Sequence, residues 1–296
     1  MRDSVIGLGE VLWDMLPEGK RLGGAPANFA YHTSQLGLGG TVVSAVGDDE
    51  LGNEIKQELD KRHLAHHLET VGYPTGTVGV TVDAAGIPVY DITTGVAWDN
   101  IHYTDTLAAL AHDARAVCFG SLAQRSECSR TTIGRFIDAM PADEGTLRIF
   151  DINLRQDFYD EGVIVASIRR CNILKLNEDE VTTVKAMFPA IACTDDLQFC
   201  RRLLGHCGLK TLILTRGGRD SAVITHDTAS VLPTPRVKLA DTVGAGDSFT
   251  AAFTSALLTG ATVTEAHRLA VDVSAFVCTC HGAMPVLPDE LKSRLK

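Results

Sequence analysis

The sequence has no cluster of lysines or arginines, and its 27 Lys+Arg against 37 Asp+Glu give a formal net charge of −10 over 296 residues. Proteins that bind nucleic acids need basic surface to neutralise phosphates, so we expect no nucleic-acid partner. No segment approaches the ~20 consecutive apolar residues that cross a bilayer, so we expect no membrane association. A small anionic ligand stays possible, because backbone N–H groups can hold one without basic side chains.

The sequence also lacks the features of an exported, disulfide-bonded protein. Its N-terminus combines Arg2 with Asp3, and the apolar run that follows is interrupted by glycines, unlike a signal peptide. The eight cysteines are scattered and form no C-x-x-C motif. This distribution favours free thiols over disulfides or a metal site. We therefore expect a protein of the reduced cytoplasm.

Several common enzyme motifs are missing. The absence of G-x-x-x-x-G-K-[ST] excludes a P-loop NTPase. The segment Gly7-Leu8-Gly9 lacks the third glycine of a dinucleotide fingerprint, which counts against a nicotinamide-dependent dehydrogenase. No G-x-S-x-G nucleophile elbow is present either. Any chemistry must therefore depend on other segments.

Short β-branched runs alternate with longer amphipathic segments along the chain, as in βα units. The runs are uninterrupted apolar stretches, which is typical of parallel strands covered on both faces. No linker, repeat or low-complexity tract divides the chain, so we expect one α/β domain over residues 1–296. We expect strands at 5–8, 42–46, 117–119, 147–150, 173–176 and 212–215, and helices at 51–62, 131–140, 195–207 and 248–258.

The region 72–101 interrupts this alternation. Residues 77–83 and 87–93 are two period-2 runs joined by Ala84-Ala85-Gly86, which is typical of a β-hairpin. A hairpin has no place in a parallel sheet. It could cover the carboxyl ends of the strands, where α/β proteins bind ligands, or it could be a surface hairpin without a gating role.

The strongest local motif is Asp241-Thr-Val-Gly-Ala-Gly-Asp247, directly before the expected helix at 248–258. Gly244 and Gly246 allow a tight turn, so the N–H groups at the helix start can point at one anion. Asp247 would lie beside that anion, where a carboxylate could accept the proton of a hydroxyl group. An ordinary capping role for Asp247 is equally consistent with the sequence.

A second motif, Gly23-Gly24-Ala-Pro26-Ala-Asn28, has glycines that permit close backbone approach and a proline suited to a first helical turn. Asn28 offers a donor and an acceptor together, which suits a polyol, although an ordinary helix start would have the same pattern. Asp14 lies just past the first strand and could accept hydrogen bonds from hydroxyls or be a solvated loop acid.

Polar segments follow three further strands, at 151–155, 177–180 and 215–218. Asn177 and Glu180 are spaced i, i+3 on one helix face, and their oxygens suit Mg²⁺. The acidic helix start at 178–180 could instead complement the helix dipole. Because the carboxyl ends of parallel strands meet at one edge of a sheet, we expect these segments to lie together there.

The two motifs at 23–28 and 241–247 together resemble the ribokinase-like, or PfkB, sugar kinases. The segments 151–155, 177–180, 215–218 and 282–285 follow in the order of that family, so the resemblance covers essentially the whole chain. It implies a three-layer α/β/α domain with a mostly parallel sheet and a small β-sheet lid from about 10–22 and 72–101. It also implies transfer of the ATP γ-phosphoryl group to a primary hydroxyl of a sugar.

The resemblance further implies roles for individual residues. Asp247 would be the catalytic base, and the backbone of Gly244, Ala245 and Gly246 would form the anion hole. The sugar would be bound by Asp14, Gly23, Gly24, Asn28 and Arg155, and Arg155 could contact either the sugar or the travelling phosphate. ATP would be bound by Asn177, Thr215 and Gly217. Glu180 would hold Mg²⁺ through water, and a possible K⁺ would be bound by Asp241, Val243 and Gly282.

Within the family, the segments 9–14, 24–28 and 151–155 are most similar to those of fructokinases, so we expect fructose as the acceptor. 2-Keto-3-deoxygluconate, ribose or another sugar is the alternative, and Tyr90 and Trp98 could pack on the sugar or be structural aromatics. An alternative function of a different class is that of a non-catalytic sugar- or nucleotide-binding protein. Such a protein would be expected to lack Asp247. An exposed lid edge could pair two subunits into a homodimer.

Overall fold

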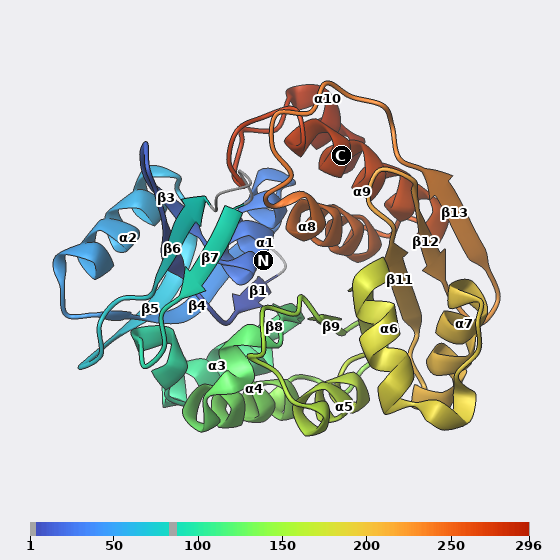
Figure 1. The fold of residues 1–296 in the computed structure, drawn as a ribbon, viewed down its shortest axis with the longest axis horizontal. Coiled ribbons are helices and arrows are strands. Elements are labelled where there is room, and N and C mark those ends of the chain that lie inside the picture. Colours follow the sequence, from blue (N-terminus) through green and yellow to red (C-terminus); the bar gives the residue numbers. More distant parts are fainter. Residues whose placement is uncertain (1–3, 83–87, 296) are drawn as a thin grey trace.

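Two β-sheets of unequal size organise the chain in the computed structural model, which describes residues 4–82 and 88–295 (Figure 1). The large sheet has nine strands in the order β13-β12-β11-β10-β9-β8-β1-β4-β5. All neighbours are parallel except β12 and β13, which form an antiparallel edge. The strands are β1 (Ser4–Leu8), β4 (Gly39–Gly47), β5 (Ala65–Val71), β8 (Ala114–Phe119), β9 (Leu147–Asp151), β10 (Ile173–Asn177), β11 (Thr211–Thr215), β12 (Asp220–Ile224) and β13 (Ala229–Pro233).

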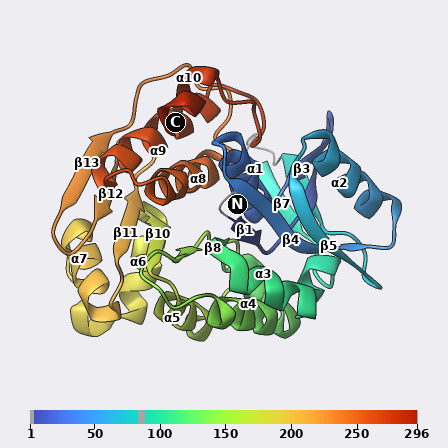
Figure 2. The same cartoon turned by 180° about the vertical axis from the view of Figure 1, so that it is seen from behind.

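Helices cover both faces of this sheet, as the two opposite views show (Figures 1 and 2). One face packs against α1 (Ala25–Gln35), α2 (Glu50–Lys61), α8 (Ala245–Leu258) and α9 (Val263–Val277), with the short α10 (Asp289–Lys292) beyond. The other packs against α3 (Asp105–Asp113), α4 (Glu127–Ala139), α5 (Glu161–Arg170), α6 (Glu178–Met187) and α7 (Asp196–Cys207). The 3₁₀ helices are η1 (Ala97–Asn100), η2 (Leu122–Arg125), η3 (Pro189–Ile191) and η4 (Ser293–Leu295).

The strand sequences explain why the sheet needs helices on both faces. Successive strand residues point to opposite sides, so Ile173 of β10 joins the core under α8 and α9 while Leu174 joins the core under α3–α7. Each strand therefore has to be apolar at consecutive positions, as expected for buried parallel strands. The sequence prediction of a three-layer α/β/α arrangement with a mostly parallel sheet is confirmed.

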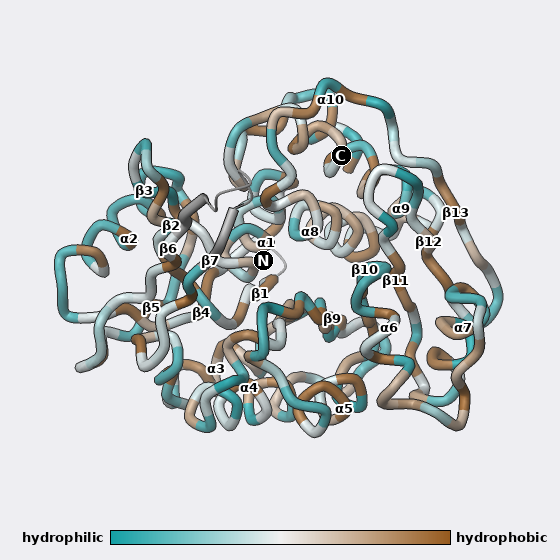
Figure 3. The backbone as a smooth tube through the Cα atoms, viewed as in Figure 1, coloured by the Kyte–Doolittle hydropathy of each residue, from teal (hydrophilic) through white to brown (hydrophobic). Residues whose placement is uncertain are grey.

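The helices differ in how many sides they bury. Helix α2 is mostly hydrophilic and turns Ile55 and Leu59, spaced i, i+4, into the core. Helix α8 is far more hydrophobic, and it is buried from Ser248 to Ala256 because it lies between α1 and α9 as well as against the sheet (Figure 3). The start of α8 therefore lies in the interior of the molecule, next to the carboxyl ends of the central strands.

The small sheet has the strand order β3-β2-β6-β7. It combines a hairpin of β2 (Leu12–Leu16) and β3 (Gly19–Gly23) with a second hairpin of β6 (Thr77–Val82) and β7 (Pro88–Ile92), joined by parallel pairing of β2 with β6. The hairpin expected within 72–101 is thus confirmed, while its turn at 84–86 lies outside the described residues. The small sheet stands apart from the large one, beside β4 and β5 (Figure 1).

Within residues 4–82 and 88–295, all eight cysteines are free thiols, as expected from their scattered positions. Over the same ranges, every helix is too short or too polar to cross a membrane.

Candidate active site

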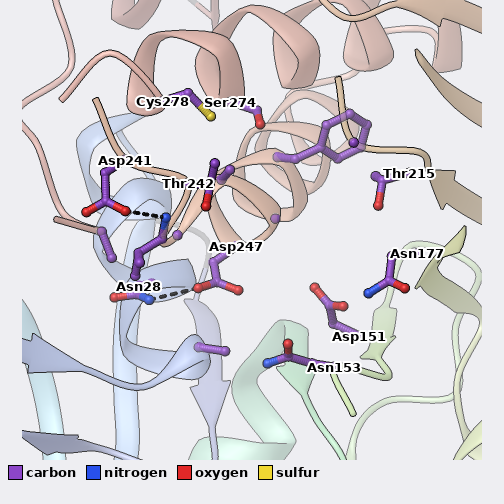
Figure 4. Close-up of a pocket in the computed structure, with 18 of the residues that line it drawn as sticks. Asn28, Asp151, Asn153, Asn177, Thr215, Asp241, Thr242, Asp247, Ser274 and Cys278 are labelled. Atoms are coloured by element: carbon purple, nitrogen blue, oxygen red, sulfur yellow. Dashed lines mark hydrogen bonds between the residues drawn. The ribbon is translucent and has the colours of Figure 1, made fainter. Parts of the chain in front are cut away.

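A cleft of about 1640 Å³ lies at the carboxyl ends of β1, β9, β10 and β11, with the start of α8 on one wall. Residues of the small sheet, including Asp14, Val78 and Ile92, line the opposite wall. This is the edge of an α/β sheet at which ligands are generally bound. The residues to which the sequence assigned catalytic, sugar-binding, ATP-binding or metal-binding roles all line this one cleft, including those from both ends of the chain. Figure 4 labels several of them, among them Asn28, Asn177 and Asp247.

The start of α8 is shaped by glycine. Gly244 precedes the helix with φ of 76°, and a Cβ there would lie 2.7 Å from the Cβ of Ala283. No side chain caps this helix terminus. The N–H of Ala245 donates to the carbonyl oxygen of Thr242 (3.3 Å), so the N–H groups of Gly246 and Asp247, which have no acceptor within the helix, are the ones offered to an anion.

Asp247 turns away from the helix terminus and into the cleft, which rules out the capping interpretation. Its Oδ2 accepts a hydrogen bond of 2.7 Å from Nδ2 of Asn28, the residue one turn into α1 (Figure 4). Burial and the nearby Asp151 carboxylate raise the pKa of Asp247 to about 6, against the lowering effect of the Asn28 hydrogen bond. Asp247 is therefore a stronger base than an ordinary aspartate and is still mostly ionised at neutral pH.

The second predicted motif lies at the end of the cleft next to the small sheet. Gly24 has φ of 112°, and a Cβ there would lie 2.4 Å from the backbone oxygen of Glu10. A Cβ at Gly23 would lie 2.5 Å from Oδ2 of Asp14, which β2 directs toward the same place. Burial raises the pKa of Asp14 to about 6, although Arg155 and Arg21 oppose this. The glycines thus leave room around a carboxylate whose charge is poorly solvated.

Glu10 also lies at this end of the cleft, and the sequence alone did not lead us to predict a role for it. It is only 3% exposed, and burial raises its pKa to about 7. Among the described residues, neither its Oε2 nor Oδ1 of Asn28 has a hydrogen-bond partner, although both side chains line the cleft. Buried acceptors are rarely left unpaired, so this end of the cleft suits a ligand with several hydroxyl donors. The sequence signal that could have indicated Glu10 was an acid two residues after the buried strand β1.

The loop after β9 reaches into the middle of the cleft and is locally strained. Asn153 and Gln156 have φ of 48° and 47°, which non-glycine residues seldom adopt and which cluster at functional sites. Arg155 between them is exposed, and its charge lowers the pKa values of Asp14 and Asp247. Arg155 is thus placed between the two ends of the cleft, consistent with a contact to the sugar or to the travelling phosphate.

The start of α6 forms another part of the wall. Asn177 caps the helix by accepting the N–H groups of Asp179 and Glu180, and Glu180 accepts the N–H groups of Asn177 (2.8 Å) and Leu154 (2.9 Å). These bonds fix the Glu180 carboxylate, whose oxygens each keep a lone pair for a further donor. Among the described residues, no group of three or more His, Cys, Asp or Glu side chains is arranged to hold a metal ion.

Thr215, the last residue of β11, and Gly217, just beyond it, lie on the same wall, and Thr215 faces the cleft near Asn177 (Figure 4). The chain at Gly217 has φ of 56°, and its carbonyl oxygen accepts the hydroxyl of Thr234. The segment 234–239 borders the cleft next to them with exposed apolar side chains, Val237 and Leu239. A ligand that contains a flat apolar ring with polar edges would fit a groove of this kind.

Asp241 joins two loops at the rim of the cleft. Its Oδ1 accepts the N–H of Val243 (3.0 Å) and its Oδ2 accepts the N–H of Gly282 (3.1 Å). Burial opposes ionisation, but these and neighbouring backbone donors outweigh it and hold the pKa of Asp241 below its usual value. The three residues predicted for a monovalent cation are therefore adjacent in space, around a firmly ionised carboxylate.

The two aromatic candidates have different outcomes. Trp98 is fully buried in η1, where it packs in the core and stacks against Arg125. The prediction that Trp98 could pack on the sugar is therefore wrong, and the residue is a structural aromatic. The sequence showed only that Trp98 follows a hairpin. It did not show that η1 packs against the small sheet. The side chain of Tyr90 lies outside the described residues.

A buried ion pair was also missed by the sequence reasoning. Lys175 lines the cleft from β10 and donates to Asp151 of β9 at 2.7 Å. The expected strand at 173–176 contained this lysine, and a lysine within an otherwise apolar buried strand was the available signal.

Comparison with known proteins gives a family match over most of the chain. Residues 18–290 match the sequence model of a protein family that is described as "pfkB family carbohydrate kinase". An ATP-dependent 6-phosphofructokinase of Thermoanaerobacterium thermosaccharolyticum is 29% identical over 97% of this chain and 91% of its own. A fructokinase of Salmonella typhimurium is 27% identical over 97% of both chains.

The fold has close counterparts among solved structures. The structure of a fructokinase from Xylella fastidiosa with bound ATP superposes with a TM-score of 0.87, covering 100% of this chain and 98% of that one at 19% identity. At this identity the likeness concerns the fold alone.

Proposed function

The chain belongs to the pfkB family of carbohydrate kinases, and from this premise we propose that it transfers the γ-phosphoryl group of ATP to a primary hydroxyl of fructose. The observation that carries the proposal is the position of Asp247. This carboxylate lies beside the open N–H groups of α8, at the point where the acid-rich end of the cleft meets the end lined by Asn177 and Thr215.

The reaction follows from this arrangement. The sugar hydroxyl oxygen forms a bond to the γ-phosphorus, the bond from that phosphorus to the β–γ bridging oxygen breaks, and ADP leaves. Asp247 accepts the hydroxyl proton, a transfer worth typically ~10²–10⁴-fold in rate. Because the transition state of phosphoryl transfer is loose, charge stabilisation and positioning dominate, and the N–H groups of Gly246 and Asp247 supply part of that stabilisation.

Fructose is proposed as the acceptor because of the charge and polarity of the sugar end. Asp14, Glu10 and Asn28 present acceptor atoms there, which suit the hydroxyls of a neutral polyol, beside the guanidinium groups of Arg21 and Arg155. The fructokinase relative supports this choice, whereas the 6-phosphofructokinase relative shows that the family also contains a phosphorylated acceptor. The fructokinase-like segments at 9–14 and 151–155 support it as well.

Glu180 would hold Mg²⁺ through water, in keeping with oxygen ligands and with a cation that retains several waters. The Oδ1 of Asn177 already accepts two backbone N–H groups, so its amide N–H₂ would donate to the ATP phosphates. The ion neutralises charge on the ATP phosphates when bound. Asp241, with the backbone at Val243 and Gly282, would form a K⁺ site. The small sheet would act as a lid that excludes water and so limits ATP hydrolysis.

The proposal is tested by ADP release from Mg-ATP with fructose, fructose 6-phosphate, ribose, 2-keto-3-deoxygluconate, tagatose, glucose and adenosine. Strong turnover of fructose that falls at least ~10²-fold in Asp247→Asn, with ATP affinity retained, is the expected result. Turnover should also stop with EDTA and return with Mg²⁺. Preference for another compound would replace fructose while leaving the base assignment in place.

The alternative of a non-catalytic binding protein has a separate signature. Calorimetry would then detect sugar and a non-hydrolysable ATP analogue, while no acceptor in the panel gave turnover above that of Asp247→Asn. The intact Asp247 and its hydrogen bond to Asn28 favour the enzyme.

A further inference from the structure

The buried lysine Lys175 has no part in the reaction as described so far. It is the third residue of β10 and only 6% exposed, between Leu174 and Leu176, which point into the core on the other face. Strand alternation turns Lys175, like Ile173, toward the face covered by α8. Lysine is seldom buried in a strand unless it is paired or functional.

The Lys175 ammonium lies directly next to the first turn of α8. A Cβ built on Gly246 would be 3.2 Å from Nζ of Lys175, so the ammonium and the backbone of the anion hole are neighbours. The ammonium is held there by Asp151, whose Oδ2 accepts from Nζ at 2.7 Å and from the hydroxyl of Thr250, in α8, at 3.1 Å. Lys175 is thus linked to α8 through its counterion as well as by proximity.

Two positive groups face this point of the cleft, beside the carboxylates of Asp151, Glu180 and Asp247. Burial would lower the pKa of Lys175, but the Asp151 carboxylate, assisted by Glu180 and Asp247, outweighs burial and raises it, so the ammonium stays charged. The positive end of the α8 dipole points at the same place. The ammonium and the helix terminus can each attract the negatively charged oxygens of a phosphoryl group that enters between them.

Lys175 also has hydrogen-bonding capacity left over. An ammonium has three N–H donors, and among the described residues the hydrogen bond from Nζ to Asp151 is the one that the structure contains. Lys175 lines the cleft, so its remaining donors have access to a ligand there. A buried ion pair without a function would be expected to cost stability relative to apolar residues of similar size.

We propose that Lys175 is a further catalytic residue, whose ammonium donates a hydrogen bond to the phosphoryl group during its transfer and stabilises the charge on its oxygens. The proposal rests on the phosphotransferase function proposed above. Lys175 keeps its proton throughout, and no bond to Lys175 forms or breaks. Asp151 is the positioning residue that holds the ammonium next to Gly246.

The first test compares three variants by steady-state kinetics. Lys175→Met should lower kcat by ~10²-fold or more while the KM values for ATP and sugar change less than threefold, because the contact is strongest in the transition state. Lys175→Arg, which keeps the charge, should recover part of the loss. Lys185→Met is the matched control, since Lys185 also pairs with one carboxylate, Asp196, but does so outside the cleft.

The second test measures binding without turnover. Calorimetry with ADP alone and with ADP, aluminium fluoride, Mg²⁺ and sugar compares the ground state with a mimic of the transferred phosphoryl group. Lys175→Met should bind ADP like the wild type but should lose at least ~10-fold in affinity for the aluminium fluoride complex. Thermal unfolding and circular dichroism on the same samples report whether the variant is folded, and Lys175→Arg provides the readout if Lys175→Met is not.

Two outcomes would overturn the assignment. One is wild-type kcat in folded Lys175→Met, and the other is an equal loss of affinity for ADP and for the aluminium fluoride complex, which would indicate a structural role. Failure of the proposed function would look different, because the wild type itself would then show neither turnover nor tighter binding in the presence of aluminium fluoride.

Discussion

Asp247 lies half-buried at the start of α8, where burial and Asp151 raise its pKa to about 6. The higher pKa makes it a better proton acceptor, but it also means that ionising Asp247 at neutral pH costs more in the folded chain than in the unfolded chain. Protonation therefore favours the folded state, and this contribution to stability is lost as pH rises from about 4 to about 6. The residue that we propose as the catalytic base is thus one whose ionisation lowers stability at neutral pH.

Activity should accordingly depend on pH through Asp247. We expect kcat/KM for the sugar to fall as pH drops through about 6, because a protonated Asp247 cannot accept the hydroxyl proton. Initial rates between pH 5 and 9 at saturating Mg-ATP test this, with circular dichroism as the control for unfolding. A rate that stays constant down to pH 5 would contradict the assignment of Asp247 as the base.

Asp14 should affect the sugar and not the nucleotide, because it lies on β2 beside Gly23, at the end of the cleft away from Thr215. In Asp14→Ala we expect the KM for the sugar to rise ~10-fold or more, in line with ~1.5–3 kcal/mol for a hydrogen bond to a charged group. The KM for ATP should change less than twofold. Asp113→Ala, an exposed aspartate at the end of α3, is the control, and an unchanged sugar KM in Asp14→Ala would remove Asp14 from the site.

At the level of helices and strands, most of the fold could be predicted from the sequence. The buried parallel strands and the amphipathic helices appear where the hydrophobic patterns place them, since burial on two faces or on one stripe fixes those patterns. Strand β5 was missed because it reads Ala-His-His-Leu-Glu-Thr-Val and is half-exposed at the sheet edge. The antiparallel edge of β12 and β13 was missed for a similar reason, since β13 alternates between exposed and half-buried residues.

The candidate site was predictable to the extent that motifs mark it. Glycine-rich segments at helix starts and acids after strands revealed the residues that line the cleft, because sheet topology brings those positions to one edge. The partners of those residues were not predictable. The Asn28–Asp247 bond and the Lys175–Asp151 pair depend on side-chain directions that arise only when α1, α8 and β10 are packed.

The geometry of the start of α8 gives a prediction at this scale. Gly244→Ala should destabilise the chain by ~1–3 kcal/mol and lower kcat at least ~10-fold, because the new Cβ would clash with Ala283 and shift the anion hole. Gly260, at the other end of α8, has φ of 90° with open space around its Cβ position, so Gly260→Ala should show the strain without the loss of kcat. Equal kinetic effects in both variants would contradict a special role for the α8 start.

Viewed as a whole molecule, the chain depends on contacts between its small sheet and its large one. Arg125 of η2 donates to both carboxylate oxygens of Asp99 and to the carbonyl oxygen of Thr93, which directly follows β7. Its guanidinium lies over the rings of Trp98 (4.0 Å) and Phe158 (4.6 Å). This cluster ties the end of the second hairpin to the loop that follows Arg155.

Removing Arg125 should therefore weaken the whole structure. Arg125→Met leaves the buried Asp99 carboxylate without its bidentate partner, and we expect a loss of ~3–5 kcal/mol in the free energy of unfolding. The double variant Arg125→Met, Asp99→Asn removes the uncompensated charge and should recover part of that loss. Urea unfolding of the wild type and the two variants measures the free energy of unfolding. If Arg125→Met is as stable as the wild type, the cluster does not stabilise the structure.

The hydrogen bond between Asn28 and Asp247 spans 219 positions of the chain. At a synthesis rate of ~5–20 residues per second, a ribosome that has made Asn28 needs roughly 10–45 s to add Asp247. During that interval the growing chain contains the residues of β1 and α1 but neither Asp247 nor helix α8, which covers one face of the sheet. The nascent protein must therefore keep an apolar sheet face from aggregating, and the cleft can be completed only after α8 has been made.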